Sequence, residues 1–486
     1  MIMPVRTAAD LLPLLPELVV AGGAFALLML DLFVGERRRF LTHLLGIALL
    51  VAVVAMVAAG VGGHGTVLSG MFVRDAAADV LKLAICAVSA LALIYTWPYL
   101  RERGLYKGEV TVLMLFAVLG MMLLVSANSL VMVYVALEML SLCSYALVVT
   151  DRDSPWGSES GIKYFVLGSL ASGLLLYGLS LIYGATGTLD LASIAAAARE
   201  SSSPLMLVTG LVFVVAGIAF KFGAAPFHMW LPDVYQGAPT PITLFIGSAP
   251  KLAAFGMTYR LLEVAAGPLE DHWRMMLAAL AVLSLALGNL GALVQSNLKR
   301  LLAYSTVSHV GFLFIGFAGG GAQGFSAAMF YAISYALMSA AAFGAIVVLS
   351  SCSPTAGGFE ADRIDDYKGL NARSPWLAGL ILCIMASLAG VPPFLGFWAK
   401  LAVLRAALDG GLMWLAIVGV VFAVIGAFYY LRVIKAMYFD APEGQMPEAK
   451  ANRPLRIVFG VNALALLALG LAWNPIMAWC QKAFAG

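Results

Sequence analysis

The stretch AFKFGAAPFHMWLPDVYQGAPTPITLF, residues 219–245, decides how the rest of the chain is interpreted. An apolar run leads into Lys221, and Gly223, Pro226 and His228 follow shortly after it. Glycine and proline release backbone groups from the helical hydrogen-bond ladder, which a membrane tolerates only beside protein or water. A charge next to such a break indicates a functional site, because ionised groups are costly in hydrocarbon.

The composition predicts a polytopic membrane protein. The 486 residues are 62% hydrophobic and 11% charged, which is too little charge to cover a soluble domain. Apolar stretches of about 18 to 25 residues recur along the chain, each long enough to cross a bilayer. The first apolar stretch, 11–34, is too long for a signal-peptide core, so we expect it to be a retained span. The formal net charge of +3, without basic stretches interleaved with aromatics, does not indicate nucleic acid as a partner.

We predict an all-α fold of about fourteen transmembrane helices. The spans are expected at 11–34, 41–60, 77–99, 109–126, 128–149, 161–184, 204–238, 241–264, 273–295, 299–318, 322–350, 374–407, 411–438 and 454–480. Stretches 189–199 and 359–370 are too short or too charged to cross, and are expected to be interfacial helices or loops. Most basic residues outside the spans fall in the odd-numbered connections, which predicts that these are cytoplasmic and that both termini are periplasmic.

A second interrupted span, LAGVPPFLGFWAK at 388–400, repeats the pattern of the first with Pro392, Pro393 and Lys400. The two broken spans, seven and twelve, are an odd number of spans apart, so they cross the membrane in opposite directions. This predicts two inverted five-helix repeats, spans 4–8 and 9–13, each with one broken helix. The expected units are an N-terminal three-span segment at 1–105, repeats at 106–266 and 267–440, and a C-terminal span at 441–486.

Four ionisable residues lie close to mid-depth in their spans: Glu138, Lys221, Lys251 and Lys400. One carboxylate cannot neutralise three lysines, so static ion pairing explains them less well than a hydrated path for protons or ions. Desolvation disfavours the charged form of lysine, which suits this residue to proton relay. A sodium path would favour carboxylates and carbonyl oxygens instead. Movement of Glu138 relative to Lys221 would then act as an electrostatic switch.

Two histidines in the spans each allow two interpretations. His309 is either a hydrogen-bonded packing residue or part of a water-linked relay, and His228 either caps the first break or conducts protons. Lys82 and Lys163 lie within about two turns of their span starts, where they can snorkel.

Metal and disulfide chemistry are not indicated. The five cysteines stand alone, without the spacing of metal ligands, and are expected to be packing residues: Cys86, Cys143, Cys352, Cys383 and Cys480. No cofactor is expected in this chain.

Six motifs carry a family resemblance: LEMLSLCSYALV, SGIKYFVLGSLASGLLLYGLSLIYGATGTLDL, FKFGAAPFHMWLPDVYQGAPTPIT, SAPKLAAF, NLKRLLAYSTVSHVGF and GVPPFLGFWAK. With them the chain resembles the antiporter-like membrane subunits of respiratory complex I, and within these the subunit N branch of bacterial NADH:quinone oxidoreductase. The likeness extends from about residue 110 to 435 and includes Glu138, Lys163, Lys221, Lys251, His309 and Lys400.

The resemblance implies proton translocation from cytoplasm to periplasm, coupled to quinone reduction in partner subunits. By this likeness Glu138 and Lys221 form a modulating pair, Lys251 is the central relay and Lys400 the terminal carrier, while Lys163 and His309 line the axis. FMN, iron–sulfur clusters and quinone are expected in partner subunits. The expected surroundings are sister antiporter-like subunits and the lipid bilayer of a bacterial inner (cytoplasmic) membrane.

Three alternatives stay open at the level of sequence. One is a subunit of an Mrp-type cation/proton antiporter, which salt-dependent growth without loss of quinone reduction would favour. Another is the membrane subunit of a related hydrogenase or ferredoxin-linked complex. The third is a passive scaffold, for which loss of Lys221 would leave coupled turnover intact.

Overall fold

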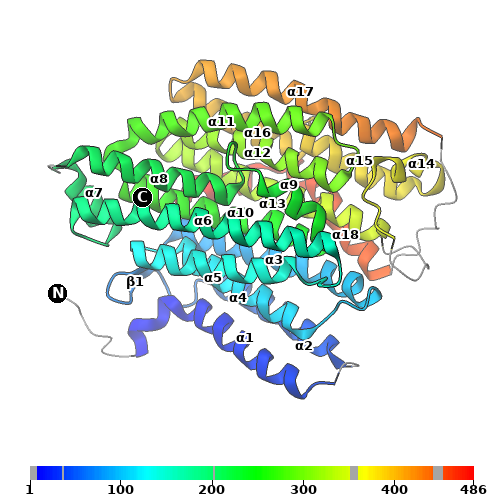
Figure 1. Cartoon of the computed structure of the whole chain (residues 1–486), viewed down its shortest axis with the longest axis horizontal. Coiled ribbons are helices and arrows are strands. Elements are labelled where there is room, and N and C mark those ends of the chain that lie inside the picture. The colour runs from blue at the N-terminus through cyan, green and yellow to red at the C-terminus, as the bar shows by residue number, and fades with distance from the viewer. Residues whose placement is uncertain (1–7, 36–37, 201–202, 351–358, 442–452, 486) are drawn as a thin grey trace.

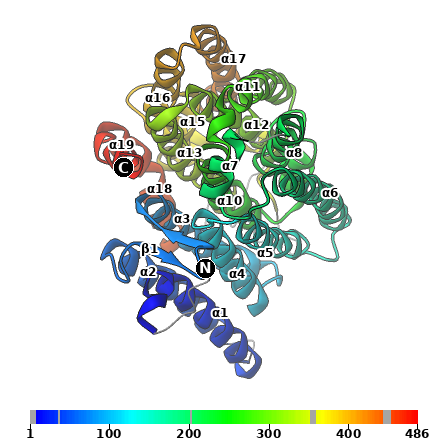
Figure 2. The same cartoon turned by 90° about the vertical axis from the view of Figure 1, so that its left-hand side faces the viewer.

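The computed structural model describes residues 8–35, 38–200, 203–350, 359–441 and 453–485. Figure 1 shows long helices lying side by side along one common direction, and Figure 2 shows the same bundle from one end. Within the described residues, twelve helices are long and apolar enough to cross a membrane. The chain is therefore a polytopic, mainly helical membrane protein.

The elements follow each other in chain order. The long helices of the first part are α1 (Leu15–Phe33), α2 (Phe40–Ala58), α3 (Ala76–Glu102), α4 (Gly108–Val125), α5 (Leu130–Val148), α6 (Pro155–Thr186), α8 (Pro204–Phe222) and α10 (Thr240–Thr258). Those of the second part are α11 (Glu270–Leu293), α12 (Leu298–Gly319), α13 (Gly321–Ser350), α15 (Pro375–Ala389), α16 (Leu395–Asp409), α17 (Met413–Tyr438) and α18 (Arg453–Leu471). The short elements are η1 (Ala8–Leu14), β1 (Gly65–Val67), β2 (Phe72–Arg74), α7 (Leu191–Arg199), α9 (Trp230–Gly237), the π-helix η3 (Tyr259–Ala265), η4 (Gly267–Leu269), η5 (Ile364–Tyr367), α14 (Leu370–Arg373) and α19 (Asn474–Ala483).

Local sequence accounts for many helix starts. Five helices begin after a residue whose side chain accepts a hydrogen bond from a backbone N–H of the first turn: Asp75, Ser129, Ser154, Asp190 and Asn297. A proline occupies one of the first two positions of α6, α8, α10 and α15, where its missing N–H costs nothing.

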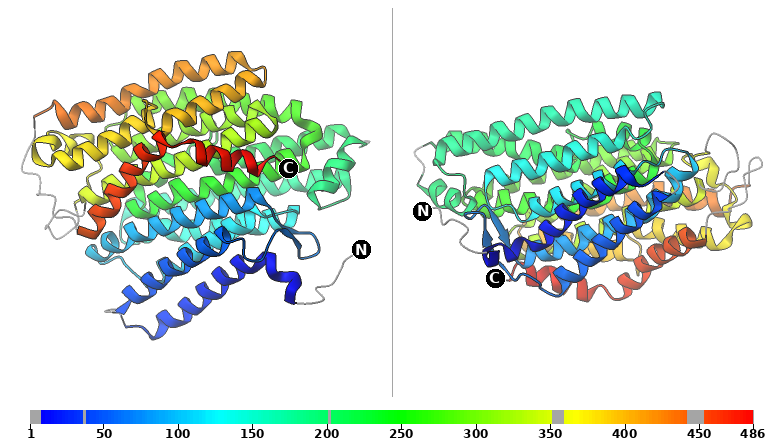
Figure 3. Two further views of the ribbon diagram at one scale, coloured as in Figure 1. Left: turned by 180° about the vertical axis from the view of Figure 1, so that it is seen from behind. Right: turned by 90° about the horizontal axis from the view of Figure 1, so that it is seen from below.

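Twelve of the predicted spans coincide with the twelve membrane-length helices. The predicted span at 241–264 is α10 continued by the π-helix η3, and the one at 374–407 is two 15-residue helices, α15 and α16. The predicted interruptions are both present. The span expected at 454–480 is shorter, because α18 ends at Leu471 and α19 continues at an angle to it (Figure 3).

The prediction of an exclusively helical fold overlooked a small hairpin. Strands β1 and β2 pair antiparallel between α2 and α3, with Gly65 opposite Arg74. The hairpin, α7 and α19 all lie at the end of the bundle that faces the viewer in Figure 2. The stretch expected to be interfacial at 189–199 is α7, and the one at 359–370 contains η5 and the start of α14.

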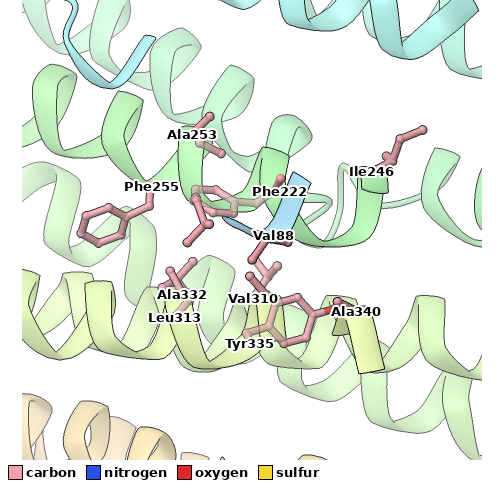
Figure 4. Packing of buried hydrophobic residues seen from close by; sticks show 14 of the residues in the cluster. Val88, Phe222, Ile246, Ala253, Phe255, Val310, Leu313, Ala332, Tyr335 and Ala340 are labelled. Atoms are coloured by element: carbon pink, nitrogen blue, oxygen red, sulfur yellow. The ribbon is translucent and has the colours of Figure 1, made fainter. Parts of the chain in front are cut away.

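The core lies where the two parts of the chain meet. The apolar window of α12 is 94% buried within the bundle, whereas those of α1, α2, α6 and α17 are 33% buried. Every residue of α10 is buried, and this helix packs against α3 and α13. Figure 4 shows Phe222 of α8 and residues of α10 beside Val310, Leu313 and Tyr335. The outer helices expose large apolar side chains, as expected of surfaces that face lipid.

Candidate functional site

Two lysines lie at the first break, Lys221 near the end of α8 and Lys251 on α10. Helix α8 ends at Phe222 and is followed by the C-cap residue Gly223, whose φ of 77° is left-handed and whose N–H donates to the carbonyls of Ala219 and Phe220. One residue before the end of α8, Lys221 donates from Nζ to Ser141 Oγ on α5, at 2.9 Å. The predicted break therefore directs a buried lysine toward the helix that carries Glu138.

Lys251 of α10 occupies the carbonyl end of the broken helix. Its Nζ donates to the carbonyl oxygen of Phe222 at 2.7 Å and lies 5.5 Å from the centroid of the Trp230 ring. The last carbonyls of a helix have no intrahelical partner and carry partial negative charge. An ammonium group is stabilised there without a carboxylate.

The second break is built in a similar way. Helix α15 ends at Ala389 and is followed by the C-cap residue Gly390, with φ of 87°, and α16 carries Lys400 back over that end. Lys400 Nζ donates to the carbonyl oxygens of Leu388 at 3.0 Å and Ala389 at 2.8 Å. Its ammonium also lies 5.2 Å from the centroid of the Phe312 ring. Again a buried lysine is held by neutral oxygen atoms at the end of an interrupted helix.

The backbone groups freed at the breaks find partners in the protein. The peptide bonds preceding Pro226 and Pro393 are cis, the second joining Pro393 to Pro392. The N–H of Ala225 donates to Ser284 Oγ on α11, and the N–H of Gly396 donates to Ser387 Oγ. These contacts satisfy the condition under which irregular backbone is tolerated at membrane depth.

Glu138 lies on α5 one turn before Ser141, the acceptor for Lys221. Its Oε1 is buried and has no hydrogen-bond partner among the described residues. Side chains three positions apart on a helix have Cβ atoms about 5–6 Å apart. The predicted pair with Lys221 is thus arranged as near neighbours, with the serine hydroxyl holding the ammonium.

His309 is part of a buried hydroxyl cluster. Its Nδ1 is hydrogen-bonded to Tyr331 Oη at 2.7 Å and its Nε2 to Tyr430 Oη at 3.1 Å. Tyr335 Oη donates to Thr306 Oγ1, one turn along α12, at 2.7 Å. Hydroxyl and imidazole groups can both donate and accept, so such a cluster can pass a proton along.

The sequence analysis missed the residues that extend this cluster toward α10. Ser339 Oγ donates to the Gly247 carbonyl at 3.1 Å, and a Cβ placed on Gly247 would lie 3.2 Å from both Ser339 Oγ and Tyr235 Oη. Gly247 is one turn before Lys251 on α10. A signal was available, because Tyr331, Tyr335 and Ser339 recur every four residues and so share one face of a helix.

Lys163 lies at the edge of the bundle rather than in its middle. Its side chain is 42% exposed and pairs with Glu159 at 2.7 Å and Asp233 at 2.8 Å. Asp233 also pairs with Arg300 Nη1 at 2.7 Å. This charged cluster links α6, α9 and α12 beside the first break, and Lys163 is partly exposed there.

His228 lies between α8 and α9, with its ring centroid 6.3 Å from that of Tyr304. Its Nδ1 is buried and finds no hydrogen-bond partner in the part of the chain that the structure describes. The side chain also interacts with the backbone of Pro226, so it stays next to the break that it was expected to cap.

Two further lysines are buried, and one of them was expected to be able to snorkel. Lys82 does not snorkel; it is fully buried, and its Nζ lies 2.7 Å from Oε1 of Glu17 on α1, which is 2% exposed. The pair is close in distance without the alignment of a hydrogen bond. Lys299, at the start of α12, is also buried, donates to the Ala238 carbonyl at 2.7 Å and lies 4.0 Å from Glu360.

Within the described residues, no three histidine, cysteine or acidic side chains gather in a way that could hold a metal ion. The described cysteines are free: Cys86, Cys143, Cys383 and Cys480. Cys352 lies outside the described residues.

Comparison with known proteins places this geometry in a family. Residues 127–426 match the family model described as "NADH:quinone oxidoreductase/Mrp antiporter, TM". NADH-quinone oxidoreductase subunit N of Xanthomonas euvesicatoria is 65% identical over 480 residues, covering 99% of this chain and 98% of the relative. Subunit N of Thiobacillus denitrificans is 49% identical over 473 residues, covering 97% of each chain.

Two solved structures have the same fold as this chain. A chain in the structure of respiratory complex I from Thermus thermophilus is 32% identical and superposes with a TM-score of 0.81 over 95% of this chain and 98% of its own length. A chain of the Mrp complex from Dietzia has a TM-score of 0.79 over 99% of this chain and 97% of its own, but at 23% identity it shows the fold alone.

The interrupted helices, the buried lysines and these likenesses define an antiporter-like membrane subunit. Within that class the chain belongs to the NADH-quinone oxidoreductase subunit N family. It is a proton-translocating membrane-arm subunit of complex I and sits among other membrane-arm subunits. The resemblance found from the sequence motifs is confirmed.

Proposed function

We propose that protons cross this subunit along a row of buried side chains in which Lys221, Lys251 and Lys400 take up and release them. The observation that carries the proposal is the kind of partner each lysine has. Each is bound to neutral oxygen atoms: a serine hydroxyl, the end of α8 or the end of α15. A neutral acceptor does not fix the charge of the lysine as a hydrogen-bonded carboxylate does, so Lys251 and Lys400 can lose a proton without leaving a buried anion beside them, while Lys221 keeps Glu138 as a neighbour that modulates its charge.

Lys82 provides the contrast within the same chain. It is equally buried but lies against the carboxylate of Glu17. Deprotonation of Lys82 would leave that charge unpaired, so we assign the pair a structural role. The difference in partners, rather than burial, separates the proposed carriers from a structural lysine.

The proposed path begins on the cytoplasmic side, at the charged cluster of Lys163. Protons then reach Lys221, whose charge state Glu138 modulates, and cross by Lys251. The hydroxyl cluster around His309 passes them to Lys400, which releases them to the periplasm. His228 supports the first half as an ionisable group beside the break.

The same proposal includes an arrangement of about fourteen spans in two inverted repeats, 106–266 and 267–440, between an N-terminal segment at 1–105 and a C-terminal span at 441–486. Both termini would face the periplasm of a bacterial inner membrane. The location of η1, the β1–β2 hairpin, α7 and α19 at one end of the bundle supports an even number of crossings (Figures 1 and 2).

Electron transfer would take place in partner subunits that hold FMN, iron–sulfur clusters and quinone. Its energy would reach this chain as a change of charge or conformation at the subunit boundary. Glu138 is suited to receive it, because a buried carboxylate oxygen without a hydrogen-bond partner in the described residues responds strongly to nearby charge.

The experiment is to assay the assembled complex in membrane vesicles with Lys221→Met, Lys251→Met or Lys400→Met singly. NADH:quinone turnover and proton pumping are expected to fall together in each variant while assembly is retained. Lys435→Met is the matched control, because that lysine is 66% exposed and pairs with Asp440 outside the buried region. Normal coupled turnover in all three variants would instead support a passive scaffold.

A further inference from the structure

A second branch of the hydroxyl cluster leads from His309 toward the end of the bundle that carries Lys435, which the proposed orientation places in the cytoplasm. His309 Nε2 is hydrogen-bonded to Tyr430 Oη at 3.1 Å. Tyr430 in turn is hydrogen-bonded to Ser305 on α12 and to Tyr429 on α17. Because these hydroxyl groups both donate and accept, the branch can carry a proton as the rest of the cluster can.

The branch continues to a buried asparagine on α11. Tyr429 interacts with Ser308, whose Oγ accepts a hydrogen bond from Asn289 Nδ2 at 3.0 Å. Asn289 is fully buried, and its Oδ1 has no hydrogen-bond partner among the described residues. A Cβ on Gly426 of α17 would lie 2.8 Å from this oxygen, so the glycine allows α17 to approach it closely. The polar branch therefore reaches within one helical turn of Leu293, the last residue of α11.

Arg432 covers this end of the branch. It lies on α17 one turn beyond Tyr429, and its Nη1 donates to the carbonyl of Leu293 at 2.9 Å. Its Nη2 donates to the carbonyl of Gln295. The last carbonyls of α11 have no partner within that helix, so the guanidinium binds there and lies across α11 and α17, which pack side by side (Figure 1). Arg432 has no carboxylate partner in the part of the chain that the structure describes, so no neighbouring side chain there balances its charge.

We propose that Arg432 is an electrostatic barrier that keeps protons in the hydroxyl cluster from returning to the water at this end of the bundle. The inference rests on the proposed function, in which the cluster passes protons to Lys400. A chain of hydroxyl groups that reached water on both sides would let protons flow back down the membrane potential. Arginine does not deprotonate in proteins, so its positive charge is always present, and a fixed positive charge on a conducting path excludes protons.

A second arginine binds a helix end in the same way but in different surroundings. Arg274 lies on α11 at the opposite end of the bundle, and it donates to the carbonyls of Ala318 and Gly410. Its Nη1 lies 3.6 Å from Oε1 of Glu270, so a carboxylate balances part of its charge. Arg274 is therefore the matched control for Arg432, because it makes the same kind of contact with helix-end carbonyls without an unbalanced charge beside the cluster.

The test measures passive proton entry into proteoliposomes of the assembled complex, without NADH, while a potassium diffusion potential drives protons inward. Arg432→Gln is expected to raise this entry about tenfold, whereas Arg432→Lys keeps a positive charge and should raise it less than about twofold. Adding Tyr430→Phe to Arg432→Gln should reverse the increase, because this change removes the hydroxyl that joins the branch to His309. Arg274→Gln should leave proton entry unchanged.

A second variant decides the matter if Arg432→Gln does not assemble. Asn289→Asp places a carboxylate one turn from the carbonyl that Arg432 binds and keeps the contacts of the arginine, so proton entry should again rise, by about threefold. The barrier is refuted if the assembled variant leaves proton entry unchanged, if Arg274→Gln raises it equally, or if Tyr430→Phe does not reverse the increase. None of these outcomes depends on NADH-driven turnover, whereas normal pumping in Lys400→Met would count against the proposed function.

Discussion

The two broken helices hold their lysines in different ways. At the first break, Lys221 precedes the interruption and turns to Ser141, while Lys251 from the next long helix occupies the carbonyl end of α8. At the second, Lys400 follows the interruption and returns to the carbonyl end of α15. The first half thus has two ammonium groups and the carboxylate of Glu138, and the second has one ammonium with two carbonyl partners.

This comparison shows how the two halves hold their lysines in the same way and how they differ. Both breaks use the partial negative charge at a helix C-terminus to hold an ammonium in an apolar environment. Among the described residues, only the first break has a buried carboxylate, Glu138, one helical turn from the residue that holds its lysine. We therefore expect the first half to respond to coupling and the second half to release protons with little modulation.

The largest effect is expected from Lys251→Arg and Lys400→Arg. Guanidinium keeps the charge and the donors that hold the helix end, but it does not deprotonate in proteins. If both lysines carry protons, pumping should fall about a hundredfold in each variant. The measurement is proton release per NADH oxidised in proteoliposomes of the assembled complex, with Lys435→Arg as control. Normal pumping with arginine would show that these lysines only stabilise the helix ends.

A smaller effect, confined to the first half, is expected from Glu138→Gln. Glu138 lies one helical turn from Ser141, the hydroxyl that holds Lys221. Loss of its charge removes roughly 1–3 kcal/mol of interaction at an effective dielectric constant near 20, so pumping should fall about tenfold. Ser141→Ala removes only the hydroxyl acceptor and should cost about threefold. Ser180→Ala is a matched control, since that serine bonds the Leu176 carbonyl of its own helix. A larger loss from Ser141→Ala than from Glu138→Gln would contradict the assigned roles.

Substituting the glycines at the two breaks, Gly223 and Gly390, by alanine should have different consequences. Alanine at either left-handed position costs about 1–2 kcal/mol of backbone energy. A Cβ on Gly223 would meet Leu231 Cδ1 at 2.2 Å, and one on Gly390 would meet Lys400 Cδ at 2.9 Å. Gly223→Ala is therefore expected to lower thermal stability alone, and Gly390→Ala to lower both stability and pumping.

The measurement for the glycine variants is the fraction of complex that stays assembled as temperature rises, together with pumping at the growth temperature. Gly173→Ala and Gly379→Ala are controls, because a Cβ at either helical position meets nothing within 4 Å. Pumping that is equally impaired in Gly223→Ala and Gly390→Ala would remove the distinction between the breaks.

The smallest effect on proton pumping is expected from Tyr335→Phe, in the hydroxyl cluster that we propose connects the two halves. This change deletes the hydroxyl that donates to Thr306 but keeps the ring, so pumping should slow about two- to threefold. Tyr177→Phe, on a side chain that is 55% exposed, is the control. An unchanged rate in Tyr335→Phe would mean that protons pass between the halves by another route.

Sequence alone predicted most of the fold, because spans and interruptions are local patterns. A lysine within an apolar run is visible without knowing its partner, which is why Lys221, Lys251 and Lys400 were identified. The partners were not visible. The carbonyl ends that hold Lys251 and Lys400 are backbone groups, exposed only once a helix has been interrupted and a neighbour packed against it.

The errors have the same origin. Lys82 was expected to snorkel because its distance from the span start allowed it, whereas its partner Glu17 lies on a different helix. The stripe of Tyr331 and Tyr335 was readable from its spacing, but tyrosines in a membrane span have an equally ordinary role in packing.

The contact between Glu17 and Lys82 has a consequence for how this chain can vary. Removing one member of a buried charge pair costs about 3–5 kcal/mol, while replacing both by apolar residues of similar size costs little. Neither position can drift alone. Natural variants should therefore keep both residues or replace both. Positions 17 and 82, which are 65 residues apart and on different helices, should covary.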